Sequence, residues 1–416
     1  MATIVVDGQD GRVPYDVRPI GPDDREAAWR LGSLAFGYHA EPMPEAYDAQ
    51  PGRRAWGAYD GDGRLVGKAV DREQGHWFGG RVVPTAGVAG LAVAPELRGR
   101  GVARQLLTRL LAGARERGAV ISTLFPTTAV PYRRAGWETV GALTYTAWPA
   151  SVLASVRAGG DVALRPASAG DVPGIAALYR DVAQAGTGMM ERSGPAFTAD
   201  PERLLKAFDG LTVAVSPSGE LIGYASWNRG RGYDPSSKVT VYDLVGMTAD
   251  ATSALLAMFG SWASVAPTVV MRLSTSDPAR LLFPPGEARI ESHEPWMLRV
   301  VDAPGAVAAR GWPANLSGEL DLDLVDDECP WNAGPYRLVL AGGEGRLEPG
   351  GSGHGVRLTA RGLAAWYAGA ASPDVLRRAG LLAGGDAGDR GPTGPGTDDL
   401  LLAATAGPPA TLHDYF

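Results

Sequence analysis

The sequence predicts a multidomain α/β protein in which one α+β unit occurs twice, the second time in degenerate form, before a third α/β region. Three observations carry this prediction. A strand, a glycine-containing loop and a helix follow one another over residues 88–118. The same order of elements returns more weakly over residues 162–264, and an alternating apolar pattern over 319–325 belongs to a region of a different kind. The length of 416 residues allows two to four domains.

The first unit begins with short elements. Asp23 and Glu26 have the spacing of a capping box, which predicts the start of a helix, and Gly37 is placed to end that helix. The sequence Asp-Gly-Asp-Gly at 60–63 is a turn signal between two runs of strand-forming residues, so it predicts a hairpin. In order, the expected elements are a strand over 15–20, a helix over 23–36, and hairpin strands over 54–59 and 64–71.

Residues 88–118 form the most informative stretch of the chain. A mostly apolar run over 88–93 predicts a strand. The helix that follows has apolar residues at i, i+3, i+4, i+7, i+8 and i+11, which predicts one buried face, and Gly118 is placed to end it. The residues of that face are Ala103, Leu106, Leu107, Leu110, Leu111 and Ala114.

Residues 98–104, here called the glycine loop, connect this strand to this helix. The N-terminus of a helix presents unpaired N–H groups and the positive end of the helix dipole. Gly99 and Gly101 tolerate positive φ and leave the backbone open to an anion. The loop therefore predicts a pyrophosphate site. Additional positive charge comes from Arg98, Arg100 and Arg104.

The glycine loop resembles the R-x-x-G-x-A signature of the GNAT acyl-CoA-dependent N-acyltransferases, which runs here from Arg98 through Gly101 to Ala103. The next segment agrees with this resemblance. Residues 119–125 predict another strand, and Tyr132 lies in the sequence PYRRAGW, where GNAT enzymes often carry their general acid. An ordinary turn before a basic helix is the alternative, but the order of the surrounding elements favours the GNAT interpretation.

The second unit repeats the first without its glycine loop. Where the first copy has RGRGVA, the second has Thr-Ala-Asp-Ala-Thr-Ser at 248–253, with an acid and no glycine. We therefore expect the second copy not to bind pyrophosphate, and to be a structural partner that shapes the active-site wall or an oligomer contact. Chance similarity is the alternative, because the matching segments are short. Residues 162–182 match 16–36, 219–223 match 63–67, 239–247 replace the strand before the loop, and 251–264 replace its helix.

The third region begins near residue 297. A strand and a short helix are predicted over 296–312. The C-terminal residues 410–416 are apolar and aromatic, where a disordered tail would be polar. The other expected elements are strands over 319–325, 336–340, 345–349 and 355–359, helices over 360–368 and 372–379, and a flexible loop over 384–396.

Composition limits the classes of partner and site. The chain has 39 Lys and Arg against 46 Asp and Glu, so its net charge of −7 argues against nucleic acid and mildly favours a cationic substrate. Cys329 is the only cysteine, which excludes an internal disulfide, and the five histidines lack metal-ligand spacing, so we expect no metal. No signal peptide or membrane-length apolar run is present, so we expect a cytoplasmic protein without a membrane partner.

Several features together resemble one family. They are the glycine loop, Tyr132, the degenerate second copy, the sequences VVDAPGAVAAR at 300–310 and CPWNAGPYRL at 329–338, and the aromatic C-terminal Phe416. Over about residues 15–416 the chain resembles the Eis family, three-domain GNAT acetyltransferases that acetylate aminoglycosides and other amines at several positions. The resemblance implies a homohexamer of chains with three domains: a catalytic GNAT domain over 1–156 that binds acetyl-CoA, a degenerate GNAT-like domain over 157–296, and a sterol-carrier-protein-like domain over 297–416 whose terminus reaches the active site.

The same resemblance implies roles for individual residues. Tyr132 would be the general acid and the free carboxylate of Phe416 the general base. Transfer would be direct, without a covalent enzyme intermediate, because Cys329 lies in the third region. Aromatic residues over 29–39 either line an amine pocket or belong to the core or an interface. Acetyl-CoA would be held by Leu91, Ala92 and Val93, by Arg98, Gly99, Arg100, Gly101, Val102, Ala103 and Arg104, and by Thr127 and Thr128.

These roles agree with the chemistry of amine acetylation. A primary amine has a pKa of ~10.4, so the site must remove a proton from the ammonium form. An α-carboxyl group has a pKa of ~3.5, so burial among aromatic side chains must raise it, or the carboxylate must act mainly by positioning the amine. A tyrosine, with a pKa of ~10, is close enough to a thiol, at ~8.5, to protonate the leaving thiolate.

Two hypotheses from different classes stay open. The preferred one is an acetyl-CoA-dependent N-acetyltransferase for primary amines of cationic substrates such as aminoglycosides, polyamines or lysine side chains. The other is a non-catalytic acyl-CoA or lipid-binding module, in which the third region carries an apolar ligand.

Overall fold

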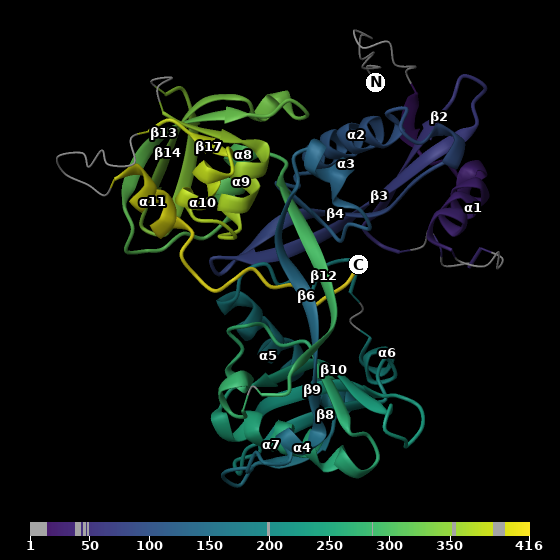
Figure 1. Cartoon of the computed structure of the whole chain (residues 1–416), viewed down its shortest axis with the longest axis vertical. Helices are drawn as coiled ribbons and strands as arrows, with labels where there is room; N and C mark the ends of the chain where they lie inside the picture. Colours follow the sequence, from purple (N-terminus) through teal and green to yellow (C-terminus); the bar gives the residue numbers. More distant parts are fainter. Residues whose placement is uncertain are drawn as a thin grey trace.

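The computed structural model describes residues 15–37, 43–44, 47, 50–197, 200–284, 286–351, 355–385 and 396–416. In this part of the chain, one sheet of twelve strands runs through the first two units, and a sheet of five strands forms the third. Figure 1 shows the three units as separate lobes, with the long strands β6 and β12 running between the first two. The predicted fold class, a repeated α+β unit followed by a different α/β unit, is confirmed.

The first unit has the predicted order of elements, with longer strands. The hairpin predicted around 60–63 is formed by β2 and β3, but β3 continues to Phe78 and pairs with β4 along most of its length. The elements are β1 Asp16–Pro19, α1 Arg25–Phe36, β2 Arg53–Tyr59, β3 Leu65–Phe78, β4 Arg81–Val93, α2 Val102–Glu116, β5 Ile121–Leu124, α3 Ala129–Arg134, β6 Glu138–Pro149 and α4 Ala150–Leu153.

The predicted capping box of the first helix is wrong. One 3-10 turn, Pro22–Asp24, precedes α1, and the residue at the N-cap is Asp24. Its backbone is already helical, with φ −92° and ψ −2°, so its side chain does not turn back to cap the helix. The Asp24 carboxylate instead accepts a hydrogen bond of 2.8 Å from the Tyr59 hydroxyl. Gly37, at φ +73°, ends α1 as predicted.

Helix α2 packs directly on the sheet. Its buried face is the predicted one except at its start, where Val102 is buried and Ala103 is only half-buried. A Cβ atom on Gly67 of β3 would lie 2.7 Å from Val102 Cγ1, so the glycine permits this close approach. Gly118, at φ +89°, follows the end of the helix as predicted.

The second unit repeats the first, as predicted. Its strand before the helix is β10, and its helix α7 lies where α2 lies in the first unit. The elements are β7 Ala163–Pro166, α5 Val172–Ala185, α6 Pro201–Leu205, β8 Gly210–Val215, β9 Leu221–Arg229, β10 Lys238–Gly246, α7 Ala249–Gly260 and β11 Thr268–Met271.

Strands β6 and β12 join the two units. The strand order is β1-β2-β3-β4-β5-β12-β6-β11-β10-β9-β8-β7. Strand β6 pairs with β12 on one side and, through Thr146–Pro149, with β11 on the other. Strand β12, Arg289–Val300, lies between β5 and β6, although its end was expected to open the third region. A strand of the twelve-stranded sheet therefore continues past residue 297, where the third region was expected to begin.

The third unit packs against the first. A Cβ atom on Gly79 would lie 2.0 Å from the Gly311 carbonyl oxygen, so the two backbones touch. Phe78 and Val83 of the first unit belong to the same hydrophobic cluster as the core of the third. The elements are α8 Ala303–Ala309, β13 Gly318–Val325, β14 Gly334–Ala341, β15 Glu344–Pro349, β16 Val356–Thr359, α9 Ala360–Tyr367, α10 Pro373–Arg378, β17 Leu382–Ala383 and α11 Thr397–Ala404. Most of the loop expected over 384–396 lies outside the described residues.

The C-terminal residues after α11 return to the junction of the first two units (Figure 1). Thr411 donates its backbone N–H to the Thr187 carbonyl at 2.8 Å and forms an isolated bridge with Ala142 of β6. Leu412 is fully buried. The chain end is therefore docked, as its composition indicated. Among the described helices, none combines the length and apolar character needed to cross a bilayer.

Candidate active site

The strands β4 and β5 separate beyond a short paired segment. They pair only at Thr85–Ile121, Ala86–Ser122 and Gly87–Thr123, whereas β4 continues to Val93. Gly90, at φ +58°, lies where the register of β4 on β3 shifts, so it forms a bulge. The edge of β4 that includes Leu91, Ala92 and Val93 therefore has no paired strand beside it in the described structure, and its backbone groups on that side are not used by a sheet.

The glycine loop follows this open strand. Gly99 and Gly101 have φ values of +78° and +86°, and Gly101 occupies the N-cap position of α2 without a side-chain cap. The first hydrogen bond at this end runs from Gln105 N to Gly101 O at 3.1 Å. The N–H groups of Val102, Ala103 and Arg104 therefore have no carbonyl earlier in the helix to bond, and they can bind an anion.

The second unit closes the corresponding position with its own side chains. Thr248 is the N-cap of α7, and its hydroxyl accepts a hydrogen bond of 3.1 Å from Ala251 N. Asp250 adds a negative charge in the first turn. A helix start that is capped and acidic does not attract phosphate. This contrast supports the prediction that only the first unit holds pyrophosphate.

The three arginines of the loop are not equivalent. Arg104 Nε lies 2.6 Å from Glu328 Oε1 of the third unit, so its charge is compensated there. Arg98 and Arg100 are exposed on either side of Gly99. Thr127 and Thr128 are also exposed, in the segment between β5 and α3.

Tyr132 lies on α3 and is 7% exposed. Its ring packs edge-on against Trp137, with 6.0 Å between centroids, in the hydrophobic cluster that contains the buried face of α2. Burial raises the pKa of Tyr132 to about 12, so the phenol is a weaker acid than free tyrosine. Burial has the same effect on a thiol in this protein, because it raises the pKa of Cys329 to about 11.

Phe416 lies beside the first unit, at the end of β5. Its ring packs edge-on against Phe125 at 5.5 Å and against His76 at 6.3 Å. Tyr415 stacks on the same Phe125 ring at 4.6 Å. Phe416, which follows the third unit in the sequence, therefore contacts side chains of the first unit.

Tyr132 and Phe416 pack near two neighbouring residues at the end of β5. Leu124 belongs to the hydrophobic cluster of Tyr132, whereas the next residue, Phe125, packs with Phe416. No described hydrogen bond or ring contact joins the two residues.

The sequence interpretation missed two buried polar residues on β3, and one of them, His76, contacts Phe416. His76 is fully buried, and its Nδ1 donates to the Gly188 carbonyl at 2.8 Å, which leaves Nε2 to accept from the Thr123 hydroxyl at 3.3 Å. Burial lowers the pKa of His76 to about 4, so the ring is neutral at pH 7. Gln74, two residues earlier on the same face, is 6% exposed, and neither atom of its amide has a partner within the described structure.

Gln74 is therefore a buried amide whose hydrogen-bonding groups the described protein leaves unused, which is costly for a fold and marks the position as unusual. The prediction missed it because β3 was expected to end at residue 71. Of the aromatic residues over 29–39, Trp29 packs edge-on against Tyr47 at 4.9 Å, and Phe36 is 38% exposed at the end of α1. Tyr38 and His39 lie outside the described residues. Within the described ranges, no group of three or more His, Cys, Asp or Glu residues is arranged to hold a metal ion.

Comparison with known proteins agrees with this geometry. Residues 16–140 and 188–300 each match an acetyltransferase (GNAT) domain, and residues 303–391 match a sterol carrier protein domain. The crystal structure of a GCN5-related N-acetyltransferase from Kribbella flavida is 32% identical, covers 97% of this chain and 99% of that one, and superposes with a TM-score of 0.82.

Two further relatives are informative. An uncharacterized N-acetyltransferase of Streptomyces coelicolor is 29% identical over 320 residues, 73% of this chain and 76% of that protein. The structure of Eis1 from Mycobacterium abscessus covers 96% of this chain and 100% of its own, with a TM-score of 0.74; at 24% identity it shows a shared fold.

Two GNAT folds followed by a sterol-carrier fold, with an open strand edge and a glycine loop in the first, define a class of acyltransferase. The chain belongs to the GCN5-related N-acetyltransferase family. It is an N-acetyltransferase, and the fold implies acetyl-CoA as the acetyl donor. The residues present fit this donor, because the unpaired edge of β4 and the uncapped helix start offer backbone groups to its amide-containing arm and its pyrophosphate.

Proposed function

We propose that this enzyme acetylates primary amines of cationic acceptors, such as aminoglycosides, polyamines or lysine side chains, as members of the Eis family do. One observation carries the proposal: Phe416, the C-terminal residue, packs on Phe125 and His76 at the end of β5. A free α-carboxylate at this point is an acid–base group and an attraction for a cation. The net charge of −7 favours the same class of acceptor.

Acetyl-CoA supplies the acetyl group as an activated thioester. The backbone of Leu91, Ala92 and Val93 on the open edge of β4 would hold its pantetheine arm. The N–H groups at the start of α2 would hold its pyrophosphate, because Gly99 and Gly101 leave that backbone accessible. The remaining contacts would come from the exposed side chains of Arg98, Arg100, Thr127 and Thr128, and from the backbone of Val102, Ala103 and Arg104.

Two residues would move protons. The Phe416 carboxylate would accept a proton from the acceptor ammonium, which must become a free amine before it can attack. Tyr132 would donate its phenolic proton to the leaving sulfur. Transfer would be direct, because the single cysteine, Cys329, is fully buried in the hydrophobic cluster of α2.

The acceptor would lie on the face of β3 that carries His76 and Gln74. Gln74 offers one donor and one acceptor group that the described protein leaves without partners. Such an amide suits acceptors that carry hydroxyl and amine groups close together. A hydrogen bond there would fix the orientation of an acceptor without selecting one chain length.

A non-catalytic acyl-CoA or lipid-binding module is the alternative, and the match of residues 303–391 to a sterol carrier protein domain is the observation in its favour. It accounts for the third unit but gives no role to the C-terminal residue at β5. We also propose a cytoplasmic homohexamer. Exposed apolar side chains support contacts between copies, and they include Leu34, Leu281 and Ile290.

Thiol release from acetyl-CoA tests the proposal. The panel would contain polyamines, aminoglycosides and lysine peptides, with products identified by mass spectrometry. We expect turnover with several amines, a loss of about two orders of magnitude in Tyr132→Phe, and a similar loss when residues are appended after Phe416. Binding of coenzyme A without thiol release from any amine would contradict the proposal and favour the binding module.

A further inference from the structure

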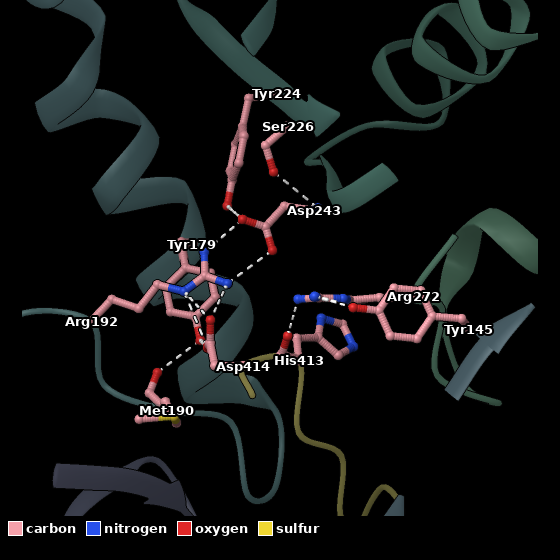
Figure 2. Close-up of polar contacts among 10 residues, drawn as sticks. All are labelled: Tyr145, Tyr179, Met190, Arg192, Tyr224, Ser226, Asp243, Arg272, His413 and Asp414. Carbon is pink, nitrogen blue, oxygen red and sulfur yellow. Dashed lines mark hydrogen bonds and ion pairs between the residues drawn. The ribbon is translucent and has the colours of Figure 1, made fainter. Parts of the chain in front are cut away.

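The C-terminal residues 410–416, here called the tail, contact two units. His413 and Asp414 bind to the second unit, and Phe416 packs on the first. Arg272 donates to the His413 carbonyl and to the Tyr145 hydroxyl, and its guanidinium lies 4.7 Å from the centroid of the Tyr145 ring (Figure 2). His413 is buried, and burial lowers its pKa, so its imidazole is neutral. These contacts fix the tail just before its acidic residue, Asp414.

Arg192 connects Asp414 to the second unit. Its guanidinium forms two hydrogen bonds with Asp243 of β10, of 2.6 and 3.0 Å, and its Nη2 lies 2.9 Å from Asp414 Oδ1. The same guanidinium stacks 3.8 Å from the centroid of the Tyr179 ring. Figure 2 shows the two carboxylates on either side of Arg192. We call Arg192, Asp243 and Asp414 the tail cluster.

The tail cluster is joined to the second unit through further hydrogen bonds of Asp243. Asp243 is buried; its backbone N–H donates to Ser226 Oγ at 3.1 Å, and Tyr224 donates to its carboxylate at 3.2 Å. Burial would raise the pKa of Asp243, but Arg192 holds it below its usual value, so the carboxylate is charged. Charge-assisted hydrogen bonds of this kind are short and directional, so they specify the geometry of the groups that they join.

We propose that the tail cluster positions the C-terminal carboxylate for acetyl transfer, so that Arg192 and Asp414 are positioning residues. Only Tyr415 separates Asp414 from Phe416, and an extended chain spans at most ~3.6 Å per residue. The terminal carboxylate therefore lies within roughly 10 Å of a backbone that the second unit fixes. Tyr415 and Phe416 are held on the other side by Phe125. This inference rests on the proposed role of Phe416 as the base.

The inference gives the second GNAT unit a function. Tyr179, Arg192 and Asp243 all belong to it, although its helix start at Thr248 is capped and lacks the glycine loop. A unit that does not bind the donor instead fixes the base that acts in its neighbour. Misplacement of a catalytic group by about 1 Å can cost about a hundredfold in rate, so a fixed tail is worth retaining.

Asp414→Ala is the variant that tests this proposal. It removes the ion pair between Asp414 and Arg192 and leaves the pair of Arg192 with Asp243 intact. A substitution of Arg192 would instead leave the Asp243 carboxylate buried without its partner, which would destabilise the fold. Asp398→Ala is the matched control. Asp398 forms a similar two-point pair with Arg377, of 2.8 and 2.9 Å, in the third unit.

We expect kcat to fall by about tenfold or more in Asp414→Ala, with KM for acetyl-CoA unchanged, because the glycine loop is not altered. Asp398→Ala should match the wild-type protein in both. A second readout is independent of activity: carboxypeptidase A releases C-terminal phenylalanine. Release of Phe416 should be about tenfold faster in Asp414→Ala than in the wild-type protein or in Asp398→Ala.

A deletion of Phe416 separates the failure of this inference from the failure of the proposed function. If Asp414 acts through Phe416, Asp414→Ala should lower kcat no further once Phe416 has been deleted. If the deletion abolishes turnover but Asp414→Ala leaves kcat and phenylalanine release at wild-type values, the inference is wrong and the base role stands. If the deletion leaves kcat unchanged, the base role is wrong, and both it and the positioning role are abandoned.

Discussion

Arg104 of the glycine loop and Glu328 of the third unit form an ion pair, with 2.6 Å between Arg104 Nε and Glu328 Oε1. Thr108, one turn further along α2, donates to the same carboxylate at 3.0 Å. The third unit therefore neutralises one of the three arginines next to the predicted pyrophosphate site. A carboxylate so close to that site opposes anion binding. Removal of its charge should therefore strengthen the binding of acetyl-CoA.

Glu328→Gln should tighten the binding of acetyl-CoA. The change leaves the charge of Arg104 uncompensated at the start of α2, and a partly exposed charge is worth up to about 1 kcal/mol, a factor of about five. We expect KM for acetyl-CoA to fall by about two- to fivefold, with a steeper dependence on salt. Glu116→Gln at the far end of the same helix, where Glu116 pairs with Arg109 at 3.5 Å, is the control. An unchanged KM in Glu328→Gln would show that Arg104 does not act on the donor.

Gly99→Ala should weaken the binding of acetyl-CoA. Gly99 has a φ of +78° and open space where a Cβ would lie, so alanine strains the backbone and covers the N–H groups that face the ligand. Gly118→Ala at the other end of α2 is matched, because Gly118 has a φ of +89° and equally open space. Both variants should lose about 1 kcal/mol of unfolding free energy. Only Gly99→Ala should raise KM for acetyl-CoA, by about tenfold, and an equal KM in the two variants would contradict the proposed site.

Tyr132→Phe should reduce kcat without an alkaline change in its pH profile. Burial raises the pKa of Tyr132 to about 12, so the phenol keeps its proton at every pH in which the protein is active. Phenylalanine retains the packing against Trp137 and removes only the phenolic hydroxyl, the proposed proton donor. Stopped-flow or steady-state thiol release from pH 6 to about 10 should give parallel profiles for the two proteins, separated by about a hundredfold. A wild-type alkaline limb that disappears in the variant would mean that Tyr132 titrates in this range.

His76 should make the protein sensitive to acid. Burial lowers its pKa from 6.5 to about 4, so the neutral ring contributes stability above pH 6.5 that is lost as the pH falls through about 4. The difference corresponds to about 3 kcal/mol of unfolding free energy. Urea unfolding at a series of pH values measures it. His76→Gln should be less stable than the wild-type protein at pH 7 but should lose less stability between pH 6.5 and 4.

The predictions from sequence were accurate where one local pattern determined the structure. The apolar spacing from Leu106 to Ala114 defined the buried face of α2, and the run of glycines and arginines at 98–104 defined its N-terminal loop. The repeat over 162–264 was recognisable for the same reason, since its turn and helix signals are local.

Features that depend on distant partners were not predictable. The end of β12 was expected in the third region, because an apolar strand does not specify which sheet accepts it. Arg192 contacts Asp243, 51 residues away, and Asp414, 222 residues away, so no spacing rule could connect the three. Gln74 was missed for a different reason: β3 continues through a polar stretch that alternation alone does not mark as a strand.

The position of β12 between β5 and β6 limits where the polypeptide can be truncated without loss of a strand. A polypeptide that ended after residue 156 would lack the strand that lies between its last two, so β5 and β6 would each present an unpaired edge, and such edges pair with other chains. Residues 1–156 alone therefore do not contain all the strands of the sheet that the first unit uses. A fragment that is meant to keep this sheet intact must therefore extend through Val300, the last residue of β12.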